Sequence, residues 1–173
     1  DASRYVYAPP ADASLIRFAW FGADKSAEFA GRTFVLNADE RLAYTPVSAA
    51  ALEGVAPGSY VTVVKASGAQ HAIDEGPRGE ASKVSLYLVN ATDQALELRL
   101  ADGSVTVIGD VSPMSSGLRA VNPVAISFGV FQRGDDAPLA TFDVSLRRGQ
   151  NLTFLADPSG VRLVENRFGP VAK

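Results

Sequence analysis

The stretch "ALELRLADGSVTVIGDV", residues 95–111, decides the fold class of this chain. Its three leucines alternate with Glu97 and Arg99, and this period of two places the leucines on one face of a strand. Asp102 and Gly103 follow, a pair that tolerates the positive φ angles of a two-residue type I′ hairpin turn. The alternation then resumes, so the stretch predicts two antiparallel strands with one face buried.

The same pattern extends along the chain in both directions. "TFDVSLRR" (141–148) alternates in the same way, and "DPSG" (157–160) separates two further apolar runs as a second hairpin turn. Strands are also predicted near the beginning, at 15–21, 32–37 and 59–66. The segment "VSAAALEGV" is ambiguous, because alanine and leucine favour helix and it could form a single turn. Several short strands at this spacing predict an all-β protein, a sandwich or a barrel.

Residues 74–83, "DEGPRGEASK", have the composition of a linker, with glycine, proline and charge but no large apolar side chain. We therefore predict two tandem, small antiparallel β-sandwich domains, at 1–75 and 84–173, joined by a linker at 76–83. A single larger sandwich is the alternative.

The overall composition, 47% hydrophobic and 20% charged, is that of a globular protein. A net charge of −3 gives no field to hold a nucleic acid, which requires clustered Lys and Arg. No run approaches the roughly 20 apolar residues that a transmembrane helix needs. The absence of cysteine excludes disulfides, a thiolate nucleophile and the common structural zinc sites. We expect no nucleic-acid partner and no transmembrane segment.

The residues that could carry catalysis form no recognisable motif. His71 is the only histidine, and no nucleophile signature accompanies the Asp74 that follows it. A polar histidine on an edge strand beside the linker is the favoured interpretation. The carboxylates flank turns, and nothing marks two of them as a buried acid–base pair. The sequence predicts no catalytic residue, no cofactor and no metal site.

Aromatic side chains often stack on sugar rings, and three of them are candidates for contact with a polymer. Trp20 would share a strand face with Ile16 and Phe18, which predicts that it lies in the core. Tyr5 and Tyr7 precede a Pro-Pro step that favours an extended, exposed chain. Tyr5 and Tyr7 are therefore the freer candidates for contact with a polymer or a partner.

Residues 83–131, "KVSLYLVNATDQALELRLADGSVTVIGDVSPMSSGLRAVNPVAISFGVF", with "VSLRRGQNLTFLA" (144–156), resemble the carboxy-terminal half of the AlgF family of alginate O-acetylation proteins. The shared order is a valine-rich strand ending in Asn, a leucine-rich strand, an Ala-Asp-Gly turn, a polar segment with Arg, an Asn-Pro-Val strand and an Arg-Gly turn. "YAPPADASLIRFAWF" (7–21) is similar to that family's opening strand. The first strand departs from the family at Phe21-Gly22, where Asn-Ala is expected, so an AlgF-like component of a cellulose-acetylation system would also fit.

This resemblance implies two tandem β-sandwiches without enzymatic activity, in a mature periplasmic protein that follows a cleaved signal. It implies a role as an adapter required for O-acetylation of a secreted exopolysaccharide, alginate or cellulose. The implied partners are a serine-hydrolase-like acetyltransferase and a membrane-bound O-acyltransferase. A carbohydrate-binding module that contacts the polymer directly is the alternative function, and an esterase dependent on His71 is a weaker third.

The segment "SSGLRAVNPVAISFGVF" (115–131) places an arginine and an Asn-Pro step directly before an apolar run. It is interpreted first as a polar loop, in which Gly117 permits a turn and Pro123 begins a strand. None of that requires an arginine, and the planar fork of Arg119 suits a carboxylate of a partner or a uronate. We therefore predict that Arg119, with Asn122 beside it, belongs to a recognition surface.

Overall fold

The computed structural model describes residues 9–36, 42–76 and 81–172. These ranges form β-strands and one turn of 3-10 helix at Ala49–Ala51, which lies within the segment that the sequence left ambiguous. The prediction of an all-β fold is confirmed. Two strand pairs are parallel, however, so two of the sheets are mixed where antiparallel sheets were expected.

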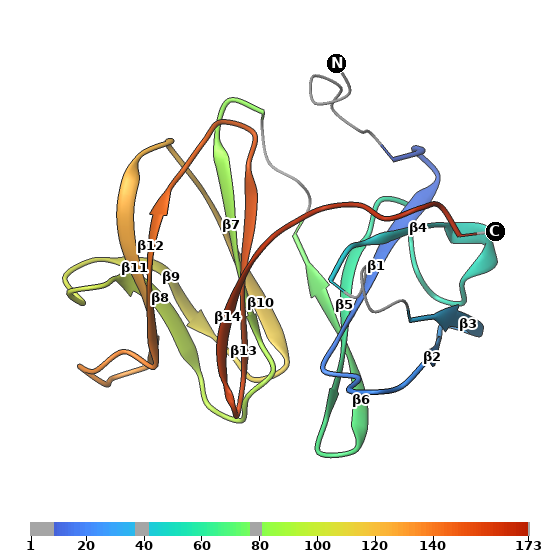
Figure 1. Cartoon of the computed structure of the whole chain (residues 1–173), viewed down its shortest axis with the longest axis horizontal. Coiled ribbons are helices and arrows are strands. Elements are labelled where there is room, and N and C mark those ends of the chain that lie inside the picture. The colour runs from blue at the N-terminus through green and yellow to red at the C-terminus, as the bar shows by residue number, and fades with distance from the viewer. Residues whose placement is uncertain (1–8, 37–41, 77–80, 173) are drawn as a thin grey trace.

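The first half of the chain is a four-stranded sheet covered on one face by a hairpin (Figure 1). The sheet has the order β4-β1-β5-β6, with bounds Thr45–Ser48, Ala13–Ala19, Tyr60–Ala66 and Ala69–Glu75. The hairpin consists of β2 (Ser26–Phe29) and β3 (Arg32–Val35). The core between the two includes Ile16, Phe18, Phe34 and Val63. We call this unit the first sandwich.

The second half is a sandwich of two four-stranded sheets. Its inner sheet has the order β10-β7-β13-β14, with bounds Ser115–Val121, Val84–Asn90, Asn151–Asp157 and Gly160–Glu165. Its outer sheet has the order β12-β11-β8-β9, with bounds Ala140–Ser145, Ala125–Gln132, Leu96–Leu100 and Thr106–Val111. Phe128 and Phe154, whose ring centroids lie 5.6 Å apart, join the two sheets in the core.

The layers follow one another across the molecule in Figure 1: outer sheet, inner sheet, the four-stranded sheet of the first sandwich, then the β2–β3 hairpin. Strands β1 and β7 are buried along their whole length, and β13 is buried at every residue except its last. Strands covered on both faces lose the apolar–polar alternation, because both sets of side chains are buried. We call the contact between the inner sheet and the first sandwich the seam.

The seam contains an apolar cluster of its own. Ala19, Val64 and Ile73 come from the first sandwich and meet Val89 and Leu155 of the second. A hydrogen bond also crosses the seam: Ser116 Oγ donates to the carbonyl of Asp74 at 2.5 Å. The two sandwiches therefore share buried apolar surface as well as polar contacts.

The residues that follow β14 cross the seam and pair with the first sandwich (Figure 1). Phe168 forms a parallel bridge with Tyr44, and the amide of Ala172 donates to the carbonyl of Pro46 at 2.9 Å. The segment 166–172 thus lies along the edge strand β4 and belongs structurally to the first sandwich. The division at 1–75, 76–83 and 84–173 stays a prediction.

The hairpin at Asp102-Gly103 exists, but its turn type was predicted wrongly. Gly103 has a φ of +78°, whereas Asp102 does not have a positive φ, so the turn is not type I′. The Asp102 carboxylate instead accepts hydrogen bonds from the amide and hydroxyl of Ser104. The type I′ geometry occurs at Ala30-Gly31 and at Ser67-Gly68, where both residues of each pair have positive φ.

The polar segment before Asn122 is a strand, and its prediction as a loop is wrong. Ser115–Val121 forms the edge strand β10, antiparallel to β7. Gly117 lies in the middle of this strand, where a Cβ atom would come within 2.5 Å of Ile108 Cγ2 and 2.8 Å of Val111 Cγ2. The glycine is therefore explained by the close approach of β9 rather than by a turn.

Trp20 does not share the core face of Ile16 and Phe18, so that prediction is also wrong. Strand β1 ends at Ala19, and Trp20 has a φ of +62° that turns its side chain out of the strand alternation. The side chain is half-buried and packs against the apolar cluster of the seam. Trp20 therefore lies at the boundary between the two sandwiches.

Candidate functional site

The centre of the seam is a buried arginine on strand β1. Arg17 has 0% exposure, and its Nη2 lies 2.8 Å from Glu75 Oε2 in an ion pair whose side chains are both fully buried. Its Nε donates to Thr62 Oγ1 at 2.7 Å, and its guanidinium carbon lies 4.4 Å from the centroid of the Tyr44 ring. All of these partners belong to the first sandwich.

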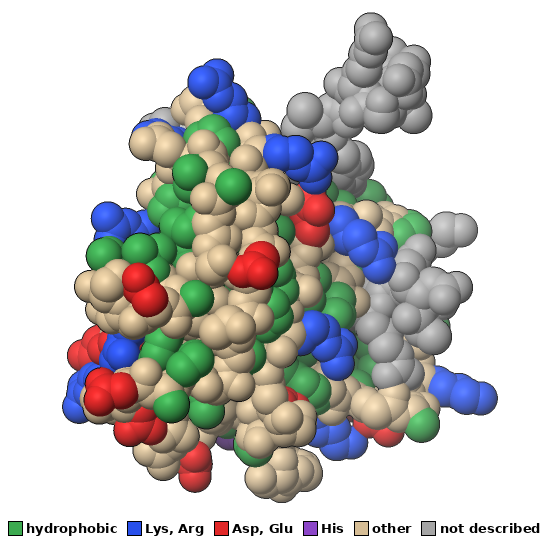
Figure 2. Space-filling view, turned by 60° about the vertical axis from the view of Figure 1, so that its left-hand side comes forward, with side chains coloured by type: hydrophobic (Ala, Val, Ile, Leu, Met, Phe, Trp, Pro, Cys, Tyr) green, Lys and Arg blue, Asp and Glu red, His purple; other side chains and the backbone are tan. Residues whose placement is uncertain are grey.

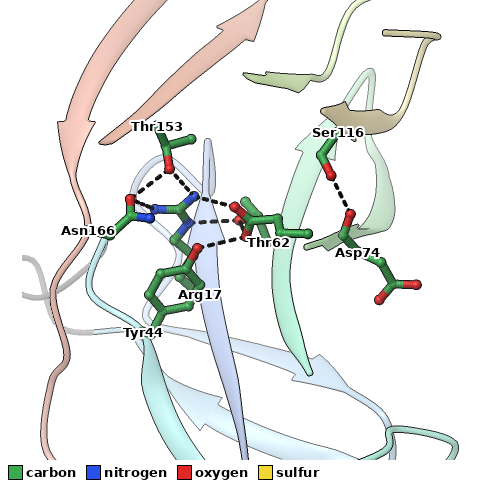
Figure 3. A network of polar contacts seen from close by, with 8 residues as sticks. Arg17, Tyr44, Thr62, Asp74, Ser116, Thr153 and Asn166 are labelled. Carbon is green, nitrogen blue, oxygen red and sulfur yellow. Dashed lines mark hydrogen bonds and ion pairs between the residues drawn. The ribbon is translucent and has the colours of Figure 1, made fainter. Parts of the chain in front are cut away.

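Strand β13 of the second sandwich and the crossing segment 166–172 supply the other hydrogen-bond acceptors of Arg17 (Figure 3). Nη1 donates to Asn166 Oδ1 and Nη2 to Thr153 Oγ1, each at 3.0 Å. Thr153 in turn donates to Asn166 Oδ1 at 2.7 Å. One guanidinium therefore joins strand β1 to strand β13 and to the first residue of the crossing segment 166–172.

The carboxylate of Glu75 is equally well satisfied. Its Oε1 accepts from the Tyr44 hydroxyl at 2.9 Å and from Thr62 Oγ1 at 2.5 Å. Burial raises the pKa of Tyr44 well above its usual value of 10.0, and the positive charge of Arg17 opposes that rise only in part. The phenol thus stays protonated and donates to the carboxylate.

This arrangement is a structural tie. Buried charges are tolerated only when they are paired and hydrogen-bonded, and here both partners are. The cluster offers no free nucleophile and its ion pair is fully buried. What it can do is hold the two sandwiches in one relative orientation.

A cavity of about 380 Å³ opens farther along the seam, beyond the end of β1. Its walls are mainly apolar and come from the first sandwich, with one basic side chain from β14 of the second. The lining includes Phe18, Trp20, Phe21, Leu36, Leu42 and Arg162. Its volume lies within the range of ligand pockets.

Arg119 is exposed on the edge strand β10. Its Nη1 donates to the carbonyl of Val107 at 3.2 Å, a bond from the edge of the inner sheet to strand β9 of the outer sheet. Asn122 lies after the strand, also exposed, and its Oδ1 accepts from Lys83 Nζ at 2.6 Å. The structure does not join Arg119 and Asn122 by a hydrogen bond, and their role in recognition stays a prediction.

Tyr5 and Tyr7, the other predicted contact residues, lie outside the described residues. His71 lies on β6, an edge strand of its sheet, as expected from the sequence. Among the described residues, His71 forms no hydrogen bond with a hydroxyl or a carboxylate, and no three potential metal ligands gather at one place. In the same residues no helix is long and apolar enough to cross a bilayer.

Arg17 was missed from the sequence, although a signal was present. In "LIRFA" one charged residue stands in a run whose remaining residues are all apolar. Such a pattern fits a strand covered on both faces, in which the charge must find a partner. Simple alternation would place Arg17 on the face opposite Ile16 and Phe18, and that face would be expected to meet solvent.

The fold and the seam define an all-β protein built of two sandwiches that hydrogen bonds from the buried Arg17 help to join. A family model described as "Alginate O-acetyl transferase AlgF" matches residues 48–153, more than half of the chain. The chain belongs to the AlgF family.

Similar proteins carry the name "Alginate biosynthesis protein AlgF". The one from Pseudomonas putida is 32% identical over 118 residues, which is 68% of this chain and 52% of that protein. The one from Pseudomonas aeruginosa is 32% identical over 108 residues, 62% of this chain and 50% of that protein. The one from Pseudomonas syringae pv. tomato is 31% identical over 104 residues, 60% and 46% respectively. The chain thus matches about half the length of these relatives.

A solved structure, of the C-terminal domain of AlgF from P. aeruginosa, is also similar to this chain. It is 28% identical, with a TM-score of 0.40, and the match covers 49% of this chain and 96% of that one.

Proposed function

We propose that this protein takes part in the O-acetylation of a secreted polysaccharide as a non-catalytic adapter of the cell envelope. The observation that carries the proposal is the family match, which extends over strands of both sandwiches. The family's relatives are named for alginate biosynthesis. The polymer is alginate or, in a related system, cellulose, and the compartment is the periplasm.

The family description names an acetyl transferase, and we propose that the transfer itself is performed by partner proteins. A hydroxyl nucleophile needs an adjacent base that a third group orients. Among the described residues His71 has no such hydrogen-bonded neighbour, and the ion pair Arg17–Glu75 is fully buried, which keeps the Glu75 carboxylate from a substrate. These features support a role in binding, with a serine-hydrolase-like acetyltransferase and a membrane-bound O-acyltransferase as the partners.

Direct recognition of the polymer is the competing function. On the face shown in Figure 2, acidic, basic and apolar side chains are interspersed, without a broad patch of a single kind. A polyanion would be held by clustered cations or by a row of exposed aromatic rings. This face favours contact with proteins over capture of a charged polymer.

The test uses purified protein and a strain that lacks its gene. We expect the deletion to abolish acetylation of the polymer, the intact protein to restore it, and the serine-hydrolase-like acetyltransferase to co-purify with it. The purified protein should not hydrolyse a chromogenic acetyl ester. Turnover of the ester that one Ser→Ala substitution removes would contradict the proposal, as would tight binding to polymer without any partner protein.

A further inference from the structure

The cavity at the end of the seam lies between core side chains of the first sandwich and Arg162 of the second. Phe18 and Phe21 form part of its wall, and their rings meet edge to face with centroids 5.5 Å apart. Leu36 and Leu42 extend the apolar wall. The cavity therefore has an apolar wall at the boundary between the two sandwiches.

Trp20 lines this cavity with a strained backbone. A φ of +62° is rare for a residue other than glycine, and for a bulky side chain it is a genuine outlier. Strained backbone of this kind clusters at active sites, ligand clamps and switch regions. With this φ strand β1 ends at Ala19, and the indole lines the cavity together with Phe18 and Phe21.

Arg162 provides the charge at the cavity. It lies on β14, exposed, and its register partner Leu155 contributes to the apolar cluster of the seam. Within the described part of the chain, the side chain of Arg162 forms no ion pair or hydrogen bond. Its guanidinium thus stands beside an apolar cavity with its donors available to a ligand.

The chemistry of this lining selects among possible ligands. A pyranose carries many hydroxyl groups, and burying any of them without a hydrogen bond is unfavourable. The side-chain donors of the cavity are the Arg162 guanidinium and the Trp20 indole N–H, and the other lining side chains are aromatic or aliphatic. A large apolar side chain suits such walls, and a carboxylate close to that side chain suits Arg162. Aromatic and leucine-sized anchors in pockets of this kind are the usual centres of protein interfaces.

We propose that this cavity is the anchor site for a protein partner, which inserts one large apolar side chain against Trp20 and pairs a neighbouring carboxylate with Arg162. The proposal rests on the proposed function, because it assigns the adapter's contact to a particular place. Both sandwiches contribute to the site, so it is complete only while the seam holds them together.

The single tryptophan of the chain makes the site directly observable. Protein labelled with 5-fluorotryptophan has one fluorine resonance, that of residue 20. We expect the unlabelled serine-hydrolase-like acetyltransferase to shift or broaden this resonance at concentrations at which the two proteins co-purify. Oligouronate and cello-oligosaccharide should leave it unchanged, and a shift with either sugar but not with the protein would overturn the proposal in favour of a sugar site.

Charge reversal supplies the second measurement. Arg162→Glu should weaken association with the acetyltransferase at least tenfold, while the matched reversal Arg148→Glu, at an exposed arginine after β12, should leave it unchanged. Suppose that the two proteins co-purify, but the fluorine resonance does not move and Arg162→Glu does not weaken their association. That result would overturn the anchor site and leave the adapter function standing. Failure of the intact protein to bind the acetyltransferase would instead overturn the adapter function, and the anchor site with it.

Discussion

Two arginines of this chain lie in opposite environments, one in the seam and the other on the open edge of the second sandwich. Arg17 is fully buried, pairs with Glu75 and contacts residues of both sandwiches. Arg119 is exposed on strand β10 and donates one hydrogen bond, to a backbone carbonyl. From the sequence we predicted a role in recognition for Arg119, because it stood in a segment interpreted as a loop. We predicted no role for Arg17.

The contrast shows that burial decides what a charged residue does for a fold. Removing one partner of a buried pair leaves an uncompensated charge in an apolar environment, whereas an exposed side chain exchanges its contacts for water. The seam should therefore be sensitive to substitution for reasons of stability. The edge should be sensitive only where a partner binds or where packing is tight.

The largest effect is expected at Arg17. Arg17→Met should lower the free energy of unfolding by about 3–5 kcal/mol, because it leaves Glu75 buried without a counter-charge. Urea denaturation of the two proteins measures the difference. Adding Glu75→Gln should recover part of the loss, and a change below about 1 kcal/mol in the single variant would show that the ion pair does not stabilise the seam.

The edge has one position at which packing should make it sensitive. Gly117→Ala would place a methyl group against Ile108 and Val111 of strand β9, and overpacking of this kind costs about 1–3 kcal/mol. Thermal unfolding should show the loss. Gly109→Ala is the matched control, because its Cβ would meet Thr106 Cγ2 only at 3.4 Å, and equal melting temperatures for both variants would contradict the close approach of β10 to β9.

The seam should also respond to alkaline pH through Tyr44. Its pKa is raised in the folded state, so the folded protein keeps a proton that the unfolded chain releases near pH 10. The contribution is fully present below pH 10 and is lost as the pH rises above it, by up to about 1.4 kcal/mol per pH unit for one group. Denaturation at pH 8 to 11 measures this slope, which Tyr44→Phe should make shallower; an unchanged slope in that variant would exclude Tyr44 as its source.

The smallest effect on stability is expected at Arg119. Arg119→Ala should change the free energy of unfolding by no more than about 0.5 kcal/mol, as for exposed substitutions in general. If β10 is a recognition surface, the same variant should reduce partner binding or polymer acetylation. A drop of several degrees in melting temperature would identify the bond to Val107 as a structural tie, and no change in either measurement would leave Arg119 without a role in recognition.

The sequence pattern predicted most clearly the strands of which one face meets solvent, although it also located the buried strands β1 and β5. Residues 95–111 and 141–148 alternate clearly, and they form strands of the outer sheet. The pattern was less informative for β1, where Arg17 must be buried because a second sheet covers its outer face. That cover comes from residues more than 130 positions away in the chain, such as Thr153, and local periodicity carries no record of it.

Local signals also misplaced two side chains at the candidate site. Trp20 continues the alternation of β1 in the sequence, but its φ of +62° ends the strand at the preceding residue. Gly117 was interpreted as a turn residue, whereas tertiary contact with β9 explains it. In both cases the deciding fact is a packing relation between elements, which the residue types alone do not encode.

Cleavage of the linker tests the central claim, that the seam fuses the two sandwiches into one unit. Cleavage at a protease site placed within 77–80 would divide the chain into two fragments. The contacts of Arg17 and of the crossing segment 166–172 would remain. We predict that the cut protein elutes from a sizing column as a single species that contains both fragments, and that Arg17→Met releases them. Two separately eluting, folded fragments from the otherwise unaltered protein would contradict the account.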